Sequence, residues 1–132
     1  MAYMLGLAVV AGVDVGPYIL AWRERFRQAE TARARLAEQA RSRLPALVRH
    51  LAAAGARRVW LFGSLADEAF HEGSDIDLAA EGLPAGAALF RLAVELDRVA
   101  APFRIDLVPL EDAHAPVRAG ILARGELLHD GH

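Results

Sequence analysis

Aspartates at alternate positions of short apolar runs are the feature that most limits how this chain can fold. The run DIDLAAE contains Asp75 and Asp77, and the later run FRIDLVPL contains Asp106. In a strand, Asp75 and Asp77 point to one face, whereas Ile76 and Leu78 point to the other. Burying an unpaired carboxylate is costly, so we expect one face to pack on a core and the other to meet a compensating group.

The remaining pattern alternates helical and extended segments. The chain begins with an apolar segment and a stretch rich in Ala, Arg, Glu and Gln. Apolar stripes of helical spacing then alternate with three β-branched or aromatic runs. Two alternatives stay open for residues 126–130, a short edge strand or a tail. The sequence therefore predicts an α/β (α+β) fold, in which a short mixed sheet is flanked by helices and preceded by an extra N-terminal helix. We predict helices at residues 22–43, 45–55, 65–70, 84–100 and 116–125, and strands at residues 57–62, 75–81 and 103–110.

The N-terminal segment differs from the rest and suggests two parts, residues 1–43 and residues 44–132. Its first 22 residues are apolar for about the length of a membrane span, but Asp14 lies in the middle and no basic residue precedes it. A membrane anchor and a start codon assigned too far upstream are the alternatives. We expect no stable membrane association, and a segment that packs on the domain or on a partner.

The amino-acid composition excludes several kinds of covalent and catalytic chemistry. The chain has no Cys, which excludes disulfides and thiolate sites and fits a cytoplasmic location, and all its 15 basic residues are Arg, which excludes Schiff-base chemistry. Residues 21–58 hold ten Arg against three Glu, a net charge of +7. This region could meet an acidic surface or nucleic acid, or be a solvated helix face. We do not expect direct binding of nucleic acid.

Three carboxylates side by side predict a metal site. If the strands bearing Asp75, Asp77 and Asp106 are neighbours, their like charges repel unless protons or cations intervene. Mg²⁺ is the hard cation that takes carboxylate and phosphate oxygens, and two such ions support phosphoryl or nucleotidyl transfer. Gly63 and Ser64 follow a strand and open a helix, where backbone N–H groups can bind a phosphate.

The spacing of these residues resembles a known family. Gly63-Ser64, ten residues, Asp75-x-Asp77, and Asp106 on a later strand are similar to the signature of the polymerase-β-like nucleotidyltransferase superfamily, and the VWLFGS and SDIDL contexts resemble its minimal nucleotidyltransferase (MNT) branch. The resemblance implies that Gly63 and Ser64 hold nucleotide phosphates. It also implies that Asp75 and Asp77 ligate both Mg²⁺ ions and that Asp106 ligates one. Many relatives carry a basic residue just after Gly-Ser, which is absent here.

The resemblance also implies a function. MNT proteins are antitoxins paired with a HEPN ribonuclease toxin, and they resemble protein adenylyltransferases that move AMP from ATP to a tyrosine of that toxin. We therefore expect a Mg²⁺-dependent protein adenylyltransferase with a neighbouring-gene HEPN partner. Two other hypotheses remain: a binding module that neutralises its partner by contact alone, and a nucleotidyltransferase for a small hydroxylated acceptor such as an aminoglycoside.

Overall fold

The N-terminal part of the chain is a small hairpin followed by a long helix. The structure is a computed structural model that describes residues 9–131, and the chain divides into two compact units, residues 1–34 and 35–132. Strands β1 (Val9–Val10) and β2 (Val13–Asp14) pair antiparallel, and helix α2 (Gly16–Arg41) follows. The carboxylate of Asp14 accepts a hydrogen bond of 2.9 Å from the backbone N–H of Gly16. This cap starts the helix earlier than the predicted residue 22.

The second unit contains the alternating helices and strands that the sequence predicts. Its elements are α3 (Leu44–Ala53), β3 (Arg58–Phe62), α4 (Gly63–Ala66), β4 (Ile76–Glu81), α5 (Gly86–Ala100), β5 (Ile105–Pro109), the 3-10 helix η1 (Leu110–Asp112), α6 (Ala115–Arg124) and β6 (Glu126–Asp130). The predicted helix at residues 65–70 is shorter and begins at Gly63. It ends after one turn because Glu68 adopts a positive φ of 57°, which an α-helix does not accommodate.

The sheet is mixed, as expected, and has the strand order β5-β4-β3-β6. Strands β4 and β5 run parallel, whereas β3 is antiparallel to both β4 and β6. Residues 126–130 are therefore an edge strand and not a tail. Arg58 lies opposite Glu81 in the β3–β4 register and donates two hydrogen bonds to it, of 3.1 and 2.7 Å. This bidentate pair fixes the register of the two central strands.

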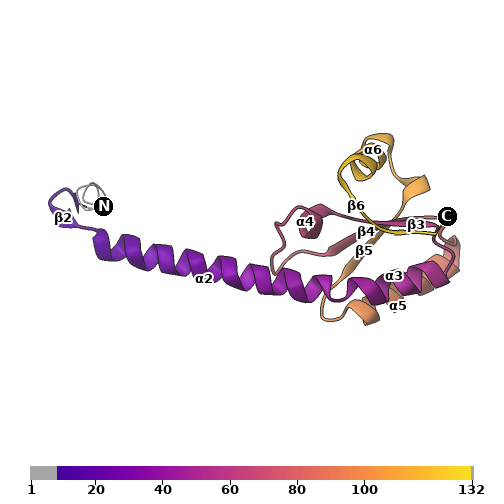
Figure 1. Cartoon of the computed structure of the whole chain (residues 1–132), viewed down its shortest axis with the longest axis horizontal. Helices are drawn as coiled ribbons and strands as arrows, with labels where there is room; N and C mark the ends of the chain where they lie inside the picture. The colour runs from indigo at the N-terminus through magenta and orange to yellow at the C-terminus, as the bar shows by residue number, and fades with distance from the viewer. Residues whose placement is uncertain (1–8, 132) are drawn as a thin grey trace. The chain divides into compact units, whose positions relative to one another are not determined.

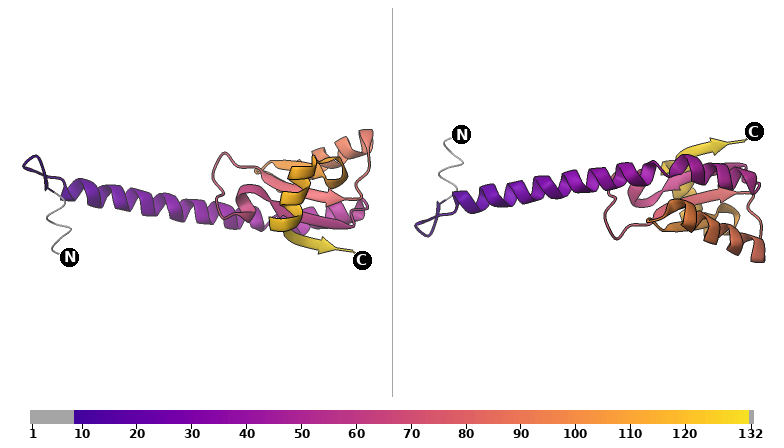
Figure 2. Two further views of the ribbon diagram at one scale, coloured as in Figure 1. Left: turned by 90° about the horizontal axis from the view of Figure 1, so that it is seen from above. Right: turned by 90° about the horizontal axis from the view of Figure 1, so that it is seen from below.

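Helices cover both faces of the sheet. Figures 1 and 2 show α3 and α5 on one face and α6 on the other. Val59 and Leu61 of β3 are fully buried in the larger core, against α3 and α5, while Trp60 belongs to a smaller core with Ile121 of α6. Because side chains alternate along β3, the end of this strand presents Phe62 to the face that α6 covers.

The described part of the chain, residues 9–131, contains no helix that is both long and apolar enough to cross a membrane. The N-terminal apolar stretch reaches further back, and its first eight residues lie outside the described range.

Candidate active site

The parallel pairing of β4 and β5 brings two of the three predicted aspartates together. Asp77 lies directly opposite Asp106 in this register, and it lies opposite Phe62 on its other side. Directly opposed residues share a face of the sheet, so both carboxylates lie on the face that α6 covers. Asp75 precedes β4 in the loop and is exposed. It remains close enough to Asp77 to affect its ionisation.

The surroundings of Asp77 perturb its pKa. Partial burial and, to a lesser extent, the negative charges of Asp106 and Asp75 together raise the pKa of Asp77 to about 6 from an ordinary value of 3.8. A hydrogen bond with Asp106 adds to the effect, because it favours the protonated form. A cation placed among these groups would lower the pKa of Asp77 again. Such perturbed carboxylates are typical of functional sites.

Gly63 follows β3 immediately and touches the Asp77 side chain. Its φ is +70°, a conformation that residues with a Cβ rarely adopt, and an added Cβ would lie 2.9 Å from the Asp77 Cγ. Only glycine therefore allows the backbone to pass this close to the carboxylate. Ser64 is the second residue of α4, and the first N–H groups of a helix have no partner inside the helix. The backbone here can receive an anion beside the aspartates.

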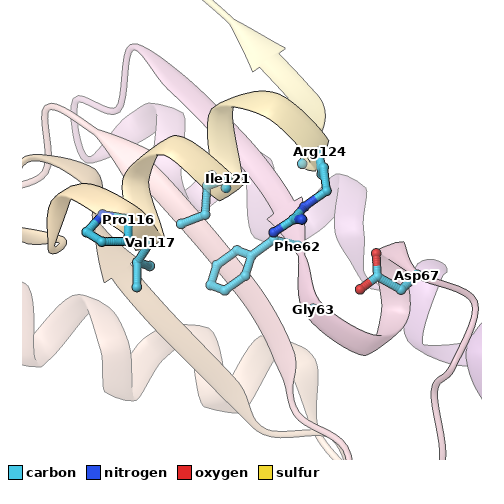
Figure 3. Close-up of a pocket in the computed structure, with 9 residues that line it drawn as sticks. Phe62, Gly63, Asp67, Pro116, Val117, Ile121 and Arg124 are labelled. Atoms are coloured by element: carbon cyan, nitrogen blue, oxygen red, sulfur yellow. The ribbon is translucent and has the colours of Figure 1, made fainter.

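A pocket of about 410 Å³ opens on the same face, next to Gly63 (Figure 3). This volume lies in the range of about 300–1,000 Å³ that is common for small-molecule sites. Apolar side chains from β3 and α6 line it, and Arg124 and Asp67 are its charged members. Figure 3 shows Arg124 extending from the end of α6 toward Phe62. The lining residues are Phe62, Gly63, Asp67, Pro116, Val117, Gly120, Ile121, Arg124 and Gly125.

Arg124 is the residue that the sequence reasoning missed. The motif lacks a basic residue after Gly-Ser, but the fold supplies Arg124 from a helix sixty residues later in the chain. Arg118 holds this helix against η1 and the residue after it, because it donates hydrogen bonds of 3.1, 2.9 and 3.0 Å to the carbonyl groups of Leu110, Glu111 and Ala113. In the sequence, Arg124 lies near the end of the predicted helix at residues 116–125, a position that gives no sign of its nearness to Gly63.

The carboxylate oxygens of the three aspartates suit Mg²⁺, although the described residues do not form a complete metal site. Within residues 9–131, no group of three acidic or histidine side chains has the arrangement of a metal site. The aspartates nevertheless supply the hard oxygen ligands that Mg²⁺ takes, together with water and substrate phosphates. The raised pKa of Asp77 shows that its negative charge is not compensated by the protein alone. The residues present therefore fit a divalent cation.

Comparison with known proteins assigns the fold to one family. The family model described as polymerase beta, nucleotidyltransferase matches residues 52–131, which include both halves of the motif, Asp106 and Arg124. The chain therefore belongs to the polymerase beta nucleotidyltransferase family. No curated protein sequence matches it.

Solved structures add a closer set of neighbours. A structure described as a minimal nucleotidyltransferase is 30% identical, with a TM-score of 0.57, and the alignment covers 67% of this chain and 92% of the other. A toxin–antitoxin structure with AMP-PNP is 26% identical, with a TM-score of 0.56 and coverage of 67% and 72%. The MntA–HepT toxin–antitoxin structure, at 21% identity, a TM-score of 0.52 and coverage of 68% and 72%, shares the fold. The chain is thus a nucleotidyltransferase similar in fold to antitoxin structures.

Proposed function

We propose that this protein is the antitoxin of a toxin–antitoxin pair and transfers AMP from Mg·ATP to a tyrosine of a HEPN ribonuclease toxin encoded beside it. The observation that carries the proposal is the alignment of Asp77 with Asp106 beside Gly63. The similarity to a toxin–antitoxin structure with AMP-PNP supports the choice of an adenine nucleotide and of a toxin partner.

The chain's own groups have distinct roles in this reaction. Asp75 and Asp77 would hold two Mg²⁺ ions and Asp106 one of them. When bound, Mg²⁺ supplies charge neutralisation at the phosphates and at the attacking and leaving oxygens. The tyrosine oxygen attacks the α-phosphorus of ATP, its proton is lost with help from Asp106, and pyrophosphate leaves. The new bond is a phosphodiester between tyrosine and AMP.

The backbone at Gly63 and Ser64 and the guanidinium of Arg124 would bind the nucleotide phosphates. Arg124 lines the same pocket as Gly63, so one phosphate chain can contact both. This arrangement would replace the basic residue that follows Gly-Ser in many relatives. The apolar side chains of Phe62 and Val117 leave the rest of the pocket suited to the nucleoside.

Two further proposals concern organisation and location. We assign residues 44–132 as the minimal nucleotidyltransferase domain, and residues 1–43 as an appended apolar segment and Arg-rich helix. The family match begins at residue 52, which supports a catalytic part on the C-terminal side of this boundary. We place the protein in the cytoplasm, where ATP and Mg²⁺ are available.

The intact mass of the neighbouring HEPN protein, after incubation with this protein, Mg²⁺ and ATP, tests the proposal. We expect a gain of one AMP mass or a multiple, and no gain with Asp75→Asn/Asp77→Asn. Asp112→Asn is the matched control, because Asp112 is an exposed carboxylate outside the motif. A stable complex that never gains mass would contradict transfer and favour neutralisation by contact alone. Turnover with a small hydroxylated acceptor, without the partner, would instead favour the small-molecule enzyme.

A further inference from the structure

An exposed apolar stripe follows the N-terminal half of α2. Ile19, Trp22, Phe26 and Ala29 are spaced by three, four and three residues, the spacing of the contact positions of a coiled coil. Trp22 and Phe26 are 59% and 49% exposed, although their rings stack on each other at a centroid distance of 5.6 Å. Large aromatic side chains exposed together on one helix face usually mark a contact surface.

Within the first unit, the described residues 9–34 do not cover this stripe. No residue between 9 and 34 is buried in the described part of the first unit. The same helix face later contributes Leu36 and Ala40 to the core of the second unit. The apolar spacing along α2 is therefore that of a packing face, which contributes to the core at Leu36 and Ala40 and is exposed at Trp22 and Phe26.

Two charged residues, Arg25 and Glu30, flank the apolar stripe at positions that pair between the helices of a coiled coil. With Ile19 and Phe26 at the a positions and Trp22 and Ala29 at d, Arg25 falls at g and Glu30 at the following e. In a parallel, in-register pair of identical helices, the g residue of one helix faces the following e residue of the other. Arg25 would then face Glu30 of the second copy, twice in each dimer.

Within one helix, Arg25 and Glu30 are not placed to form an ion pair with each other. Arg25 and Glu30 are five residues apart, whereas side chains interact along a helix at separations of three or four. Glu24 and Arg27, at a separation of three, show the ordinary intrahelical arrangement with a contact of 2.6 Å. Glu30 also has Arg27 and Arg33 three residues away on its own helix, whereas Arg25 has no acidic residue at a separation of three or four. A pairing of Arg25 with Glu30 arises only between two helices.

We propose that residues 18–30 of α2 bind the same segment of a second copy of this chain, as a short parallel two-stranded coiled coil. The seam ends at Arg33, the next a position, where two identical charges would meet. Tyr18, at a g position and 71% exposed, extends the apolar contact at the other end. A seam of about two heptads is short, so the dimer is weak and depends on protein concentration.

Sedimentation of the purified full chain over a concentration series tests this proposal. We expect a monomer–dimer equilibrium, and a dimer that dissociates roughly tenfold more readily in either Arg25→Glu or Glu30→Arg, because each change replaces two attractions with two repulsions. The double variant Arg25→Glu/Glu30→Arg should regain the affinity of the wild type. Arg35→Glu is the matched control, since it makes the same charge change at an exposed position outside the seam.

Circular dichroism checks that each variant keeps its helix, and tryptophan emission gives a second measurement. Only Trp22 should change its emission on dilution, because Trp60 is buried within the fold at 4% exposure. A chain that stays monomeric at every concentration would overturn the proposal. A dimer that is indifferent to the single charge reversals, or that the double reversal fails to restore, would overturn the parallel arrangement.

Discussion

Replacing Asp77 by Asn should stabilise the fold while it abolishes nucleotidyl transfer. The folded chain raises the pKa of Asp77 to about 6 from 3.8. Each pKa unit corresponds to about 1.4 kcal/mol, so the ionised carboxylate costs the fold at most about 3 kcal/mol above pH 6. Asp77 is partly accessible to solvent, which screens its interactions. We therefore expect the Asn variant to be more stable by about 1–2 kcal/mol at pH 7.5.

The stability that Asp77→Asn gains over the wild type should increase as the pH rises. Because the pKa of Asp77 is higher in the folded chain than in the unfolded chain, the fold favours the protonated carboxyl group. This contribution to wild-type stability is fully present below about pH 4, is lost as the pH rises from about 4 through 6, and stays constant above that. The Asp77→Asn variant has no carboxyl group to ionise at this position, so it does not lose this stability as the pH rises. The two proteins should therefore approach each other in stability at low pH and differ most at neutral pH.

Urea unfolding between pH 4 and pH 8, with EDTA present, measures this difference. Mg²⁺ should then raise the unfolding midpoint of the wild type more than that of Asp77→Asn, because a cation compensates the clustered charges. Asp112→Asn controls for the removal of a surface charge. Equal stability of the wild type and Asp77→Asn at pH 7.5, or a difference that grows toward pH 4, would refute a raised pKa of Asp77 in the folded chain.

Three further changes probe other parts of the molecule. Gly63→Ala should lower activity and destabilise the fold by about 1–3 kcal/mol, measured by urea unfolding, since its Cβ would clash with Asp77 at a positive φ. Arg124→Ala should raise the KM for ATP in steady-state assays, while Arg91→Ala, an exposed position on the other helical layer, leaves it unchanged. Leu61→Ala should cost about 2–5 kcal/mol in unfolding experiments, because Leu61 is fully buried in the larger core; a cost below about 1 kcal/mol would contradict that packing.

The sequence predicted the sheet well because its strands carry strong local signals. Buried apolar positions alternate with Asp77 and Asp106, and this period of two fixes which side chains share a face. The helix at residues 86–100 follows equally well from its apolar stripe, which buries Leu92 and Leu96. The parallel register of β4 and β5 confirms the expectation that Asp77 and Asp106 are neighbours. The alternation of side chains along each strand did not predict whether the two strands run parallel or antiparallel.

What the sequence did not reveal depends on contacts between distant segments. Arg124 reaches the pocket beside Gly63 only because β6 pairs with β3 and carries the end of α6 to that place. The sequence around Arg124 predicts a helix and leaves residues 126–130 open between an edge strand and a tail, so it does not reveal the pairing with β3. The one-turn length of α4 was missed for a different reason. Glu68 takes a left-handed conformation that its residue type does not favour, so tertiary context overrides local preference.

The order of the strands also affects when activity can arise during synthesis. The turn at Gly63, for which we propose phosphate binding, and the first aspartates are made early. Their partner Asp106 lies on β5, and Arg124 ends α6, shortly before β6. A nascent chain that stops before residue 125 would therefore carry the motif without a complete pocket. Under the proposed function, nearly the whole of the second unit would have to leave the ribosome and fold before nucleotidyl transfer begins.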